Sequence, residues 1–233
     1  MTRGNNAPDD SPVNPGSIKT FKFKDGVLTS LAAIQPGDGM HFGPRHLDFH
    51  PTQPWVYVSI ESQNKLYVYR RDPATGLSRE PLFIKETLSD PKTVFRQGAG
   101  TIHMHPDGRF VYQANRASST VKFEGKDVFT GGENSIAVFS INQKTGEPTL
   151  IQNIDARGIQ PRTFALDPGA RMLVAASLQP LPVRDGAAVK TLSAGLTAFR
   201  IGADGKLTFV HKYDVDVGNK TQFWSGMVTL REV

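Results

Sequence analysis

The chain contains no cysteine, which excludes a disulfide framework, a thiolate metal site and a cysteine nucleophile. It has no apolar run near the roughly 18 residues that a membrane-spanning helix needs, so no membrane partner is expected. The N-terminal stretch MTRGNNAPDDSPVNPG has no apolar core, which argues against a signal peptide and predicts a cytoplasmic protein. The net charge of +5 is spread along the chain, and no nucleic-acid partner is expected.

Two catalytic signatures are also missing. Thr130-Gly131-Gly132-Glu133 lacks the spacing and the lysine of a phosphate-binding loop. Trp224-Ser225-Gly226 is not the G-x-S-x-G elbow of a serine hydrolase. No cofactor is expected.

Repetition is the main feature of what is present. The 22 glycines and 16 prolines among 233 residues indicate many turns and argue against a helical bundle. Three apolar runs each end at a proline: 44–51, 101–106 and 161–168. A second run follows each of them, at 55–58, 110–112 and 172–174, and then a third, at 65–69, 135–139 and 195–199. Each third run leads through a turn into a short fourth segment.

These short β-branched and aromatic runs, bounded by Gly, Pro, Asn and Asp, predict strands joined by tight turns. Four of them within roughly 50–60 residues are typical of a β-propeller blade. We therefore predict an all-β fold of four-stranded antiparallel blades. A copy of the third and fourth runs at 17–28 indicates one further, incomplete blade.

The repeats divide the chain into a part blade, three whole blades and a closing strand: 1–42, 43–98, 99–157, 158–213 and 214–233. The segments 122–134 and 181–186 lie between second and third runs and are predicted to be inserted loops. A propeller closes with about four to eight blades. We therefore expect the C-terminal portion of a longer protein, or a ring that an assembly partner completes. Open edges of an incomplete ring predict self-association.

Three motifs together resemble the lactonase family of seven-bladed β-propellers: GPRHLDFHP with WVYVSIES, HMHPDGRFVYQANRAS, and GIQPRTFALDPGARMLVAAS. That family includes a bacterial type of 6-phosphogluconolactonase and a fungal muconate lactonizing enzyme. The resemblance extends from about residue 16 to 233 and implies that about four of seven blades are present. The N-terminal blades are missing, and with them a histidine that the family uses as acid or base.

The resemblance implies an active site on one face of the ring, near its axis, that contains Arg45, His46, Glu61 and Arg116. Glu61 and Arg116 each lie ten residues after the proline that ends their first run, so we expect them at the same level of neighbouring blades. The third blade has Leu178 there, which confines the site to part of the ring.

Opening a lactone needs an aimed water, stabilisation of the developing oxyanion and a cation for the acidic substituent. Arginine pairs bidentately with phosphate or carboxylate, so Arg45, Arg116 and Arg162 are predicted to bind substrate. His46 and Glu61 are the predicted catalytic residues, since each can take a proton from water or orient a neighbour. Two arginines beside Glu61 would lower its pKa and favour the orienting role. The leading prediction is hydrolysis of an acidic sugar lactone, 6-phosphogluconolactone first among them.

Alternatives stay open. The repeated arginines can instead satisfy backbone carbonyls around the axis, and His46 can be a core residue beside Asp48. His103 and His105 share one strand face, but no carboxylate accompanies them at a diagnostic spacing, so no metal is predicted. The alternative functions are a non-catalytic propeller that binds an anionic ligand or a protein, and a muconate-type cycloisomerase. Arg3 is a candidate for the position of Arg116 in the part blade.

Overall fold

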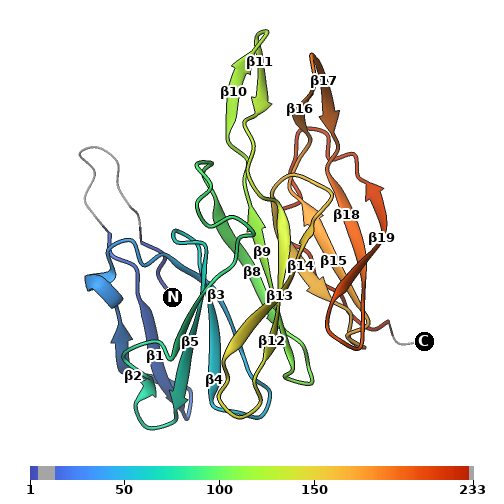
Figure 1. Cartoon of the computed structure of the whole chain (residues 1–233). Coiled ribbons are helices and arrows are strands. Elements are labelled where there is room, and N and C mark those ends of the chain that lie inside the picture. The colour runs from blue at the N-terminus through green and yellow to red at the C-terminus, as the bar shows by residue number, and fades with distance from the viewer. Residues whose placement is uncertain (5–13, 231–233) are drawn as a thin grey trace.

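The computed structural model describes residues 1–4 and 14–230 and consists almost entirely of β-strands (Figure 1). Three antiparallel sheets stand side by side in chain order, and a two-stranded hairpin precedes them. The short 3₁₀ helix η1 (Pro36–Gly39) is the one helical element of the described residues. The predicted all-β fold of four-stranded blades is confirmed.

Each sheet runs outward from an inner strand. The first sheet contains β3 (Pro44–Phe49), β4 (Trp55–Ile60), β5 (Lys65–Asp72), β6 (Gly76–Leu77) and β7 (Phe83–Glu86). The second contains β8 (Gly98–Met104), β9 (Phe110–Arg116), β12 (Ser135–Ile141) and β13 (Pro148–Asp155). The third contains β14 (Pro161–Leu166), β15 (Met172–Ser177), β18 (Gly195–Ile201) and β19 (Leu207–Asp214). In the first sheet, both β6 and β7 pair with β5.

Three hairpins complete the described chain. They are β1 (Ile18–Lys24) with β2 (Val27–Ile34), β10 (Thr120–Phe123) with β11 (Lys126–Phe129), and β16 (Leu181–Asp185) with β17 (Ala188–Leu192). The last two project from the same side of the molecule (Figure 1).

The segments predicted to be inserted loops lie between second and third strands as expected, but they form the hairpins β10–β11 and β16–β17. The prediction of loops was wrong because both segments have hairpin turn chemistry. Glu124 and Gly125 have φ of 48° and 76°, as a two-residue turn between tightly paired strands requires. Gly186, with φ of 64°, starts the corresponding turn of the second hairpin.

Apolar clusters between the sheets form the core. β4 is buried on both faces: Val56 and Val58 pack toward the β1–β2 hairpin, and Trp55 and Tyr57 pack toward the second sheet. A third cluster joins the second and third sheets. Alternation along the strands of the first and second sheets therefore serves two cores, because each of these sheets lies between two neighbours.

A hydrogen bond from a tyrosine to a turn glycine, here called the tyrosine–glycine joint, links two pairs of successive sheets. Tyr57 Oη donates a hydrogen bond to the carbonyl oxygen of Gly146, and Tyr112 Oη to that of Gly205, each over 3.0 Å. Each glycine sits in the turn before the outer strand of the next sheet and has a positive φ, 79° for Gly146 and 78° for Gly205. A Cβ at Gly146 would lie 2.5 Å from the Trp55 ring, so only glycine fits between the aromatic residue and the turn.

The segment 214–233, predicted to be a closing strand, contains no strand in its described part after Asp214, and residues 231–233 lie outside the described residues. Gln222 N instead donates to Leu178 O over 2.8 Å, which holds the segment against the third sheet. The closing strand and the boundaries between the part blade and the three blades stay predictions; the strands of the three sheets span 44–86, 98–155 and 161–214.

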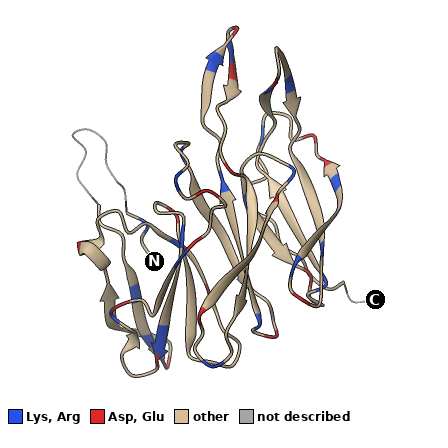
Figure 2. Ribbon diagram, in the orientation of Figure 1, with Lys and Arg blue, Asp and Glu red and all other residues tan. Residues whose placement is uncertain are grey.

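Charged side chains lie mainly in the loops and hairpins, with both signs interspersed, and the middle of most sheet strands is uncharged (Figure 2). Among the described residues, no helix has the length and apolar character to span a membrane.

Candidate functional site

The site lies where inner strands begin and second strands end. Antiparallel pairing sets Pro44 opposite Ile60 in the first sheet and Gly98 opposite Arg116 in the second. In both sheets the start of the inner strand therefore lies beside the end of the second strand. The inner strands β3 and β14 both contact β8, so the inner strands of the three sheets lie close together. The predicted residues therefore come from one end of the molecule.

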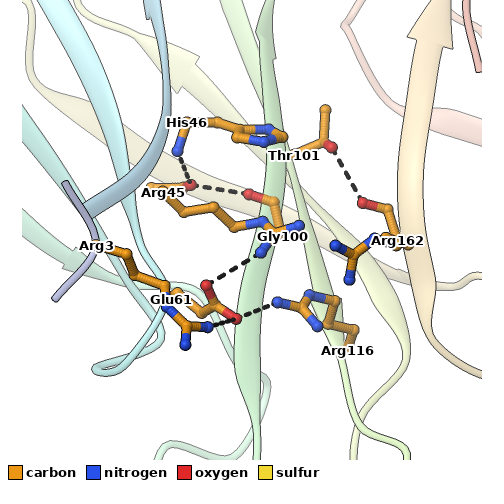
Figure 3. A network of polar contacts seen from close by, with 9 residues as sticks. Arg3, Arg45, His46, Glu61, Gly100, Thr101, Arg116 and Arg162 are labelled. Atoms are coloured by element: carbon orange, nitrogen blue, oxygen red, sulfur yellow. Dashed lines mark hydrogen bonds and ion pairs between the residues drawn. The ribbon is translucent and has the colours of Figure 1, made fainter. Parts of the chain in front are cut away.

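A β-bulge positions both arginines of the repeated Pro-Arg motif. In β3 the pairing passes from Pro44 to His46, and in β14 from Pro161 to Thr163, so Arg45 and Arg162 have no partner residue across the strand. An extra residue of this kind bends the strand and redirects its side chain. The bulges thus turn the two guanidinium groups toward the space between the sheets (Figure 3).

Glu61 is the centre of an ion-pair cluster (Figure 3). Its Oε2 accepts from Arg45 Nη1 over 3.1 Å, and its Oε1 accepts from Arg3 Nη1 over 3.2 Å. Arg116 Nη2 also donates to Oε1. The side chains of Glu61, Arg45 and Arg116 are only 13%, 13% and 10% exposed, and that of Arg3 is 60% exposed. One carboxylate therefore holds three guanidinium groups.

The charges of the cluster control its protonation. Burial works to raise the pKa of Glu61, but Arg116, Arg45 and Arg3 outweigh it and lower that pKa below its ordinary value. Burial, with Arg45, lowers the pKa of Arg116, and Glu61 opposes that change. Glu61 is therefore ionised at neutral pH, and both of its oxygens are engaged by arginines.

Arg3 stands beside the β1–β2 hairpin as Arg116 stands beside β12 of the second sheet. Thr2 pairs with Ser17 as Asn115 pairs with Ser135, and in each case the arginine is the next residue. The hydrogen bonds Thr2 N to Ser17 O (2.9 Å) and Ser17 N to Thr2 O (2.8 Å) fix this short segment beside β1.

His46 lies one residue after Arg45, half-buried. Its backbone N–H donates to Ser59 Oγ over 3.3 Å, and Ser59 Oγ in turn donates to Gly100 O over 2.8 Å (Figure 3). Burial, followed by the charge of Arg45, lowers the pKa of His46 from 6.5 to about 4. The imidazole is therefore neutral at physiological pH and can accept a proton.

Two aromatic residues of the C-terminal segment complete this side of the site. The Trp224 ring meets the His46 ring at a centroid distance of 5.5 Å and an interplanar angle of 63°. The guanidinium carbon of Arg162 lies 3.8 Å from the centroid of the Phe223 ring, a cation–π contact. Burial, with Arg45, lowers the pKa of Arg162.

Two cavities flank the ion-pair cluster, and Arg3 lines both. The larger, about 700 Å³, is lined by Glu61, Arg116 and the polar segments 96–98 and 116–120. The smaller, about 260 Å³, is lined by Arg45, His46, Arg162, Phe223 and Trp224, among others. The arginines and the neutral histidine therefore face space that a small anionic molecule can occupy.

The structure brings all five predicted site residues to this region. Arg45 and Arg116 both pair with Glu61, and His46 and Arg162 line the smaller cavity. No hydrogen bond of the Arg45 or Arg162 guanidinium to a backbone carbonyl is found in the described residues. The sequence interpretation missed Phe223 and Trp224, because no local pattern indicates a contact with residues so distant in the chain.

The histidines weighed as metal ligands have other partners. His103 Nδ1 lies 3.7 Å from Asp48 Oδ2, and its ring meets Phe164 edge-on at 5.1 Å. His105 Nδ1 lies 2.7 Å from Asp107 Oδ1, and its Nε2 lies 3.2 Å from Ala170 O. These contacts join turns and neighbouring strands, so both rings have a structural use.

Comparison with known proteins identifies relatives of the chain. The family model described as "Lactonase, 7-bladed beta-propeller" matches residues 15–179. The 6-phosphogluconolactonase of Bacillus subtilis (strain 168) is 37% identical over 160 residues, which cover 69% of this chain and 40% of that protein.

Solved structures agree on the fold. A protein from Lactobacillus plantarum superimposes with a TM-score of 0.66 at 25% identity, covering 88% of this chain and 50% of that one. The periplasmic gluconolactonase of Pseudomonas aeruginosa, 21% identical, gives a TM-score of 0.60 over 79% of this chain and 42% of that one. The chain thus spans about half the length of these relatives, or less.

Proposed function

Because this chain belongs to the lactonase family of seven-bladed β-propellers, we propose that it hydrolyses an acidic sugar lactone and that 6-phosphogluconolactone is the substrate. The observation that carries the proposal is the set of three arginines that share the single carboxylate of Glu61 beside a cavity of about 700 Å³. Such a cluster retains positive charge, and arginine binds phosphate bidentately.

The two cavities suggest a division of roles. Arg116, in the wall of the larger cavity, holds the anionic substituent of the substrate. Arg45 and Arg162, in the smaller one, bind the lactone end, where their N–H groups stabilise the oxyanion that develops on the carbonyl oxygen. Glu61 is a positioning residue, because its oxygens are already taken up in holding the guanidinium groups.

His46 is the proposed general base. It accepts a proton from the water whose oxygen attacks the lactone carbonyl carbon. The ring C–O bond then breaks, the proton passes to the leaving ring oxygen, and the open-chain sugar acid is released. Burial, followed by the charge of Arg45, holds the pKa of His46 low, at about 4. A bound anion offsets the charge of the arginines and raises that pKa toward the range in which a base works best.

The test is the activity of the purified chain on 6-phosphogluconolactone. Arg116→Ala is expected to lower kcat/KM at least hundredfold while the melting temperature stays close to that of the wild type, because Glu61 keeps Arg45 and Arg3. Arg79, exposed and outside both cavities, provides the matched control: Arg79→Ala keeps full activity. Equal activity of Arg116→Ala and the wild type would refute the assignment. Saturable binding of 6-phosphogluconate without any turnover would favour a binding propeller.

Two further expectations stay predictions. The first is the cytoplasmic location. A structural relative of the same fold is described as periplasmic, so the fold is compatible with either compartment. Self-association through open sheet edges is the other, and analytical ultracentrifugation of the chain at several concentrations measures it.

A further inference from the structure

The larger cavity reaches beyond the ion-pair cluster to side chains that the chemistry above does not use. Arg96, Ser118 and Ser119 lie in its wall. Arg96 is exposed, and within the described residues no carboxylate pairs with it. The hydroxyl groups of Ser118 and Ser119 have no hydrogen-bond partner in that part of the chain either. These are donors without a protein acceptor, beside the substrate cavity.

The strand pairing explains why these groups converge. Gly98 lies opposite Arg116 where β8 and β9 pair, and a Cβ at Gly98 would lie 3.7 Å from Arg116 Nη2. Arg96 precedes Gly98 by two residues, so the two Cα atoms are at most about 7 Å apart. Ser118 and Ser119 follow Arg116, the last residue of β9, by two and three residues. The segment that precedes β8 and the segment that follows β9 therefore meet beside Arg116, at the edge of the ion-pair cluster.

The excess of positive charge around the two cavities favours a ligand with more than one negative charge. Glu61 is the only carboxylate among the described residues that line the two cavities, and five arginines line them: Arg3, Arg45, Arg96, Arg116 and Arg162. A phosphate monoester carries about −1.5 to −2 charges at pH 7 and three acceptor oxygens. An unphosphorylated sugar lactone is neutral and leaves this charge uncompensated.

We propose that Arg96, together with the hydroxyl groups of Ser118 and Ser119, completes a phosphate subsite that begins at Arg116, and that this subsite selects phosphorylated over unphosphorylated sugar lactones. The inference rests on the proposed function and deepens it. Arg116 approaches the phosphate from the ion-pair cluster, and Arg96 from the segment before β8. The lactone end then points toward Arg45 and His46.

Two substrates and one variant test the subsite. Arg96→Ala is expected to lower kcat/KM for 6-phosphogluconolactone at least tenfold and to change kcat/KM for glucono-δ-lactone less than twofold. Arg96→Lys keeps the charge without the planar fork and is expected to fall between Arg96→Ala and the wild type. Arg79→Ala is the matched control and changes neither value. A loss that is equal for both lactones, or no loss for either, would overturn the inference.

Binding separates this inference from the proposed function. By titration calorimetry, the wild type is expected to bind 6-phosphogluconate at least tenfold more tightly than gluconate, and Arg96→Ala is expected to lose that preference. If no lactone is hydrolysed but the preference is present and depends on Arg96, the phosphate subsite stands and the hydrolase proposal fails. A wild type without preference for the phosphorylated ligand overturns the subsite, whatever the turnover.

Discussion

Glu61 and Arg116 occupy the same position in two successive repeats, and their side chains form an ion pair across the boundary between two sheets. Glu61 directly follows the second strand of the first sheet, and Arg116 is the last residue of the second strand of the second sheet. Each lies ten residues after a proline. Stacking of the sheets brings equivalent positions side by side, so opposite charges at one level become a pair. In the third sheet Leu178 stands at this position, and the cluster does not continue there.

Replacing Glu61 by glutamine is expected to lower the free energy of unfolding at pH 7 by about 3 kcal/mol, because arginines that share a buried carboxylate lose their counter-charge. The arginines lower the pKa of Glu61 below its ordinary 4.5, so its contribution is present above pH 4.5 and lost as the pH falls through the lower folded-state value. Urea denaturation at pH 7 and at pH 3 measures both effects. Exposed Glu124→Gln is the control; a wild-type-to-variant difference that stays constant with pH would contradict the prediction.

The imidazole of His46 is expected to titrate with a midpoint of about 4, because burial, Arg45 and then His103 and Arg116 disfavour its protonated form. The unfolded chain takes up this proton near pH 6.5 and the folded chain does not. The wild type therefore loses stability as the pH falls from about 6.5 to 4, and His46→Gln removes that part of the loss. Histidine NMR measures the midpoint, and a value near 6.5 would disprove the burial and charge argument.

The hydroxyl group of Tyr112 is expected to stabilise the fold, because it donates to Gly205 O in a fully buried joint. Tyr112→Phe should lower the free energy of unfolding by about 1 kcal/mol. Tyr69 is equally buried, but its hydroxyl has no hydrogen-bond partner in the described residues, so Tyr69→Phe should be neutral or stabilising. Equal losses in the two variants, measured by urea denaturation, would show that the hydrogen bond is not what matters.

Alanine at Gly146 is expected to be more harmful than alanine at Gly26, although both glycines have φ of 79°. A Cβ at Gly26 meets no atom within 4 Å, so Gly26→Ala carries only the backbone cost of about 1 kcal/mol. At Gly146 the Cβ collides with the Trp55 ring, which adds at least about 1–3 kcal/mol of overpacking. Melting curves of both variants measure the difference. Similar falls in melting temperature would contradict the prediction and would mean that the Trp55 ring moves aside.

Local patterns were sufficient to predict most of the fold. Proline-ended runs and turn residues mark strands within each repeat, and equal spacing from Pro51 and Pro106 predicts that Glu61 and Arg116 share a level. The structure places these two side chains in contact. The hairpin β10–β11 was missed because each of its strands has only four residues and most of their side chains are exposed, so a buried face is not visible in the sequence.

The rest of the candidate site depends on contacts that no local signal carries. Trp224 meets His46 across most of the chain length, and this contact depends on where Gln222 anchors the C-terminal segment to the third sheet. The bulge at Arg45 likewise follows from pairing between two strands, not from the Pro-Arg dipeptide alone. Chemistry at this site therefore depends on tertiary packing.

The tyrosine–glycine joint also bears on how such chains grow over evolutionary time. The second sheet contains both halves of the joint: Tyr112, which donates to the next sheet, and Gly146, which accepts from the previous one. A gene duplication that copied this unit whole would insert a blade already able to join both neighbours, with no compensating substitution. Val174 stands at the tyrosine position of the third sheet and has no hydroxyl group, so a copy inserted after that unit would lack this bond.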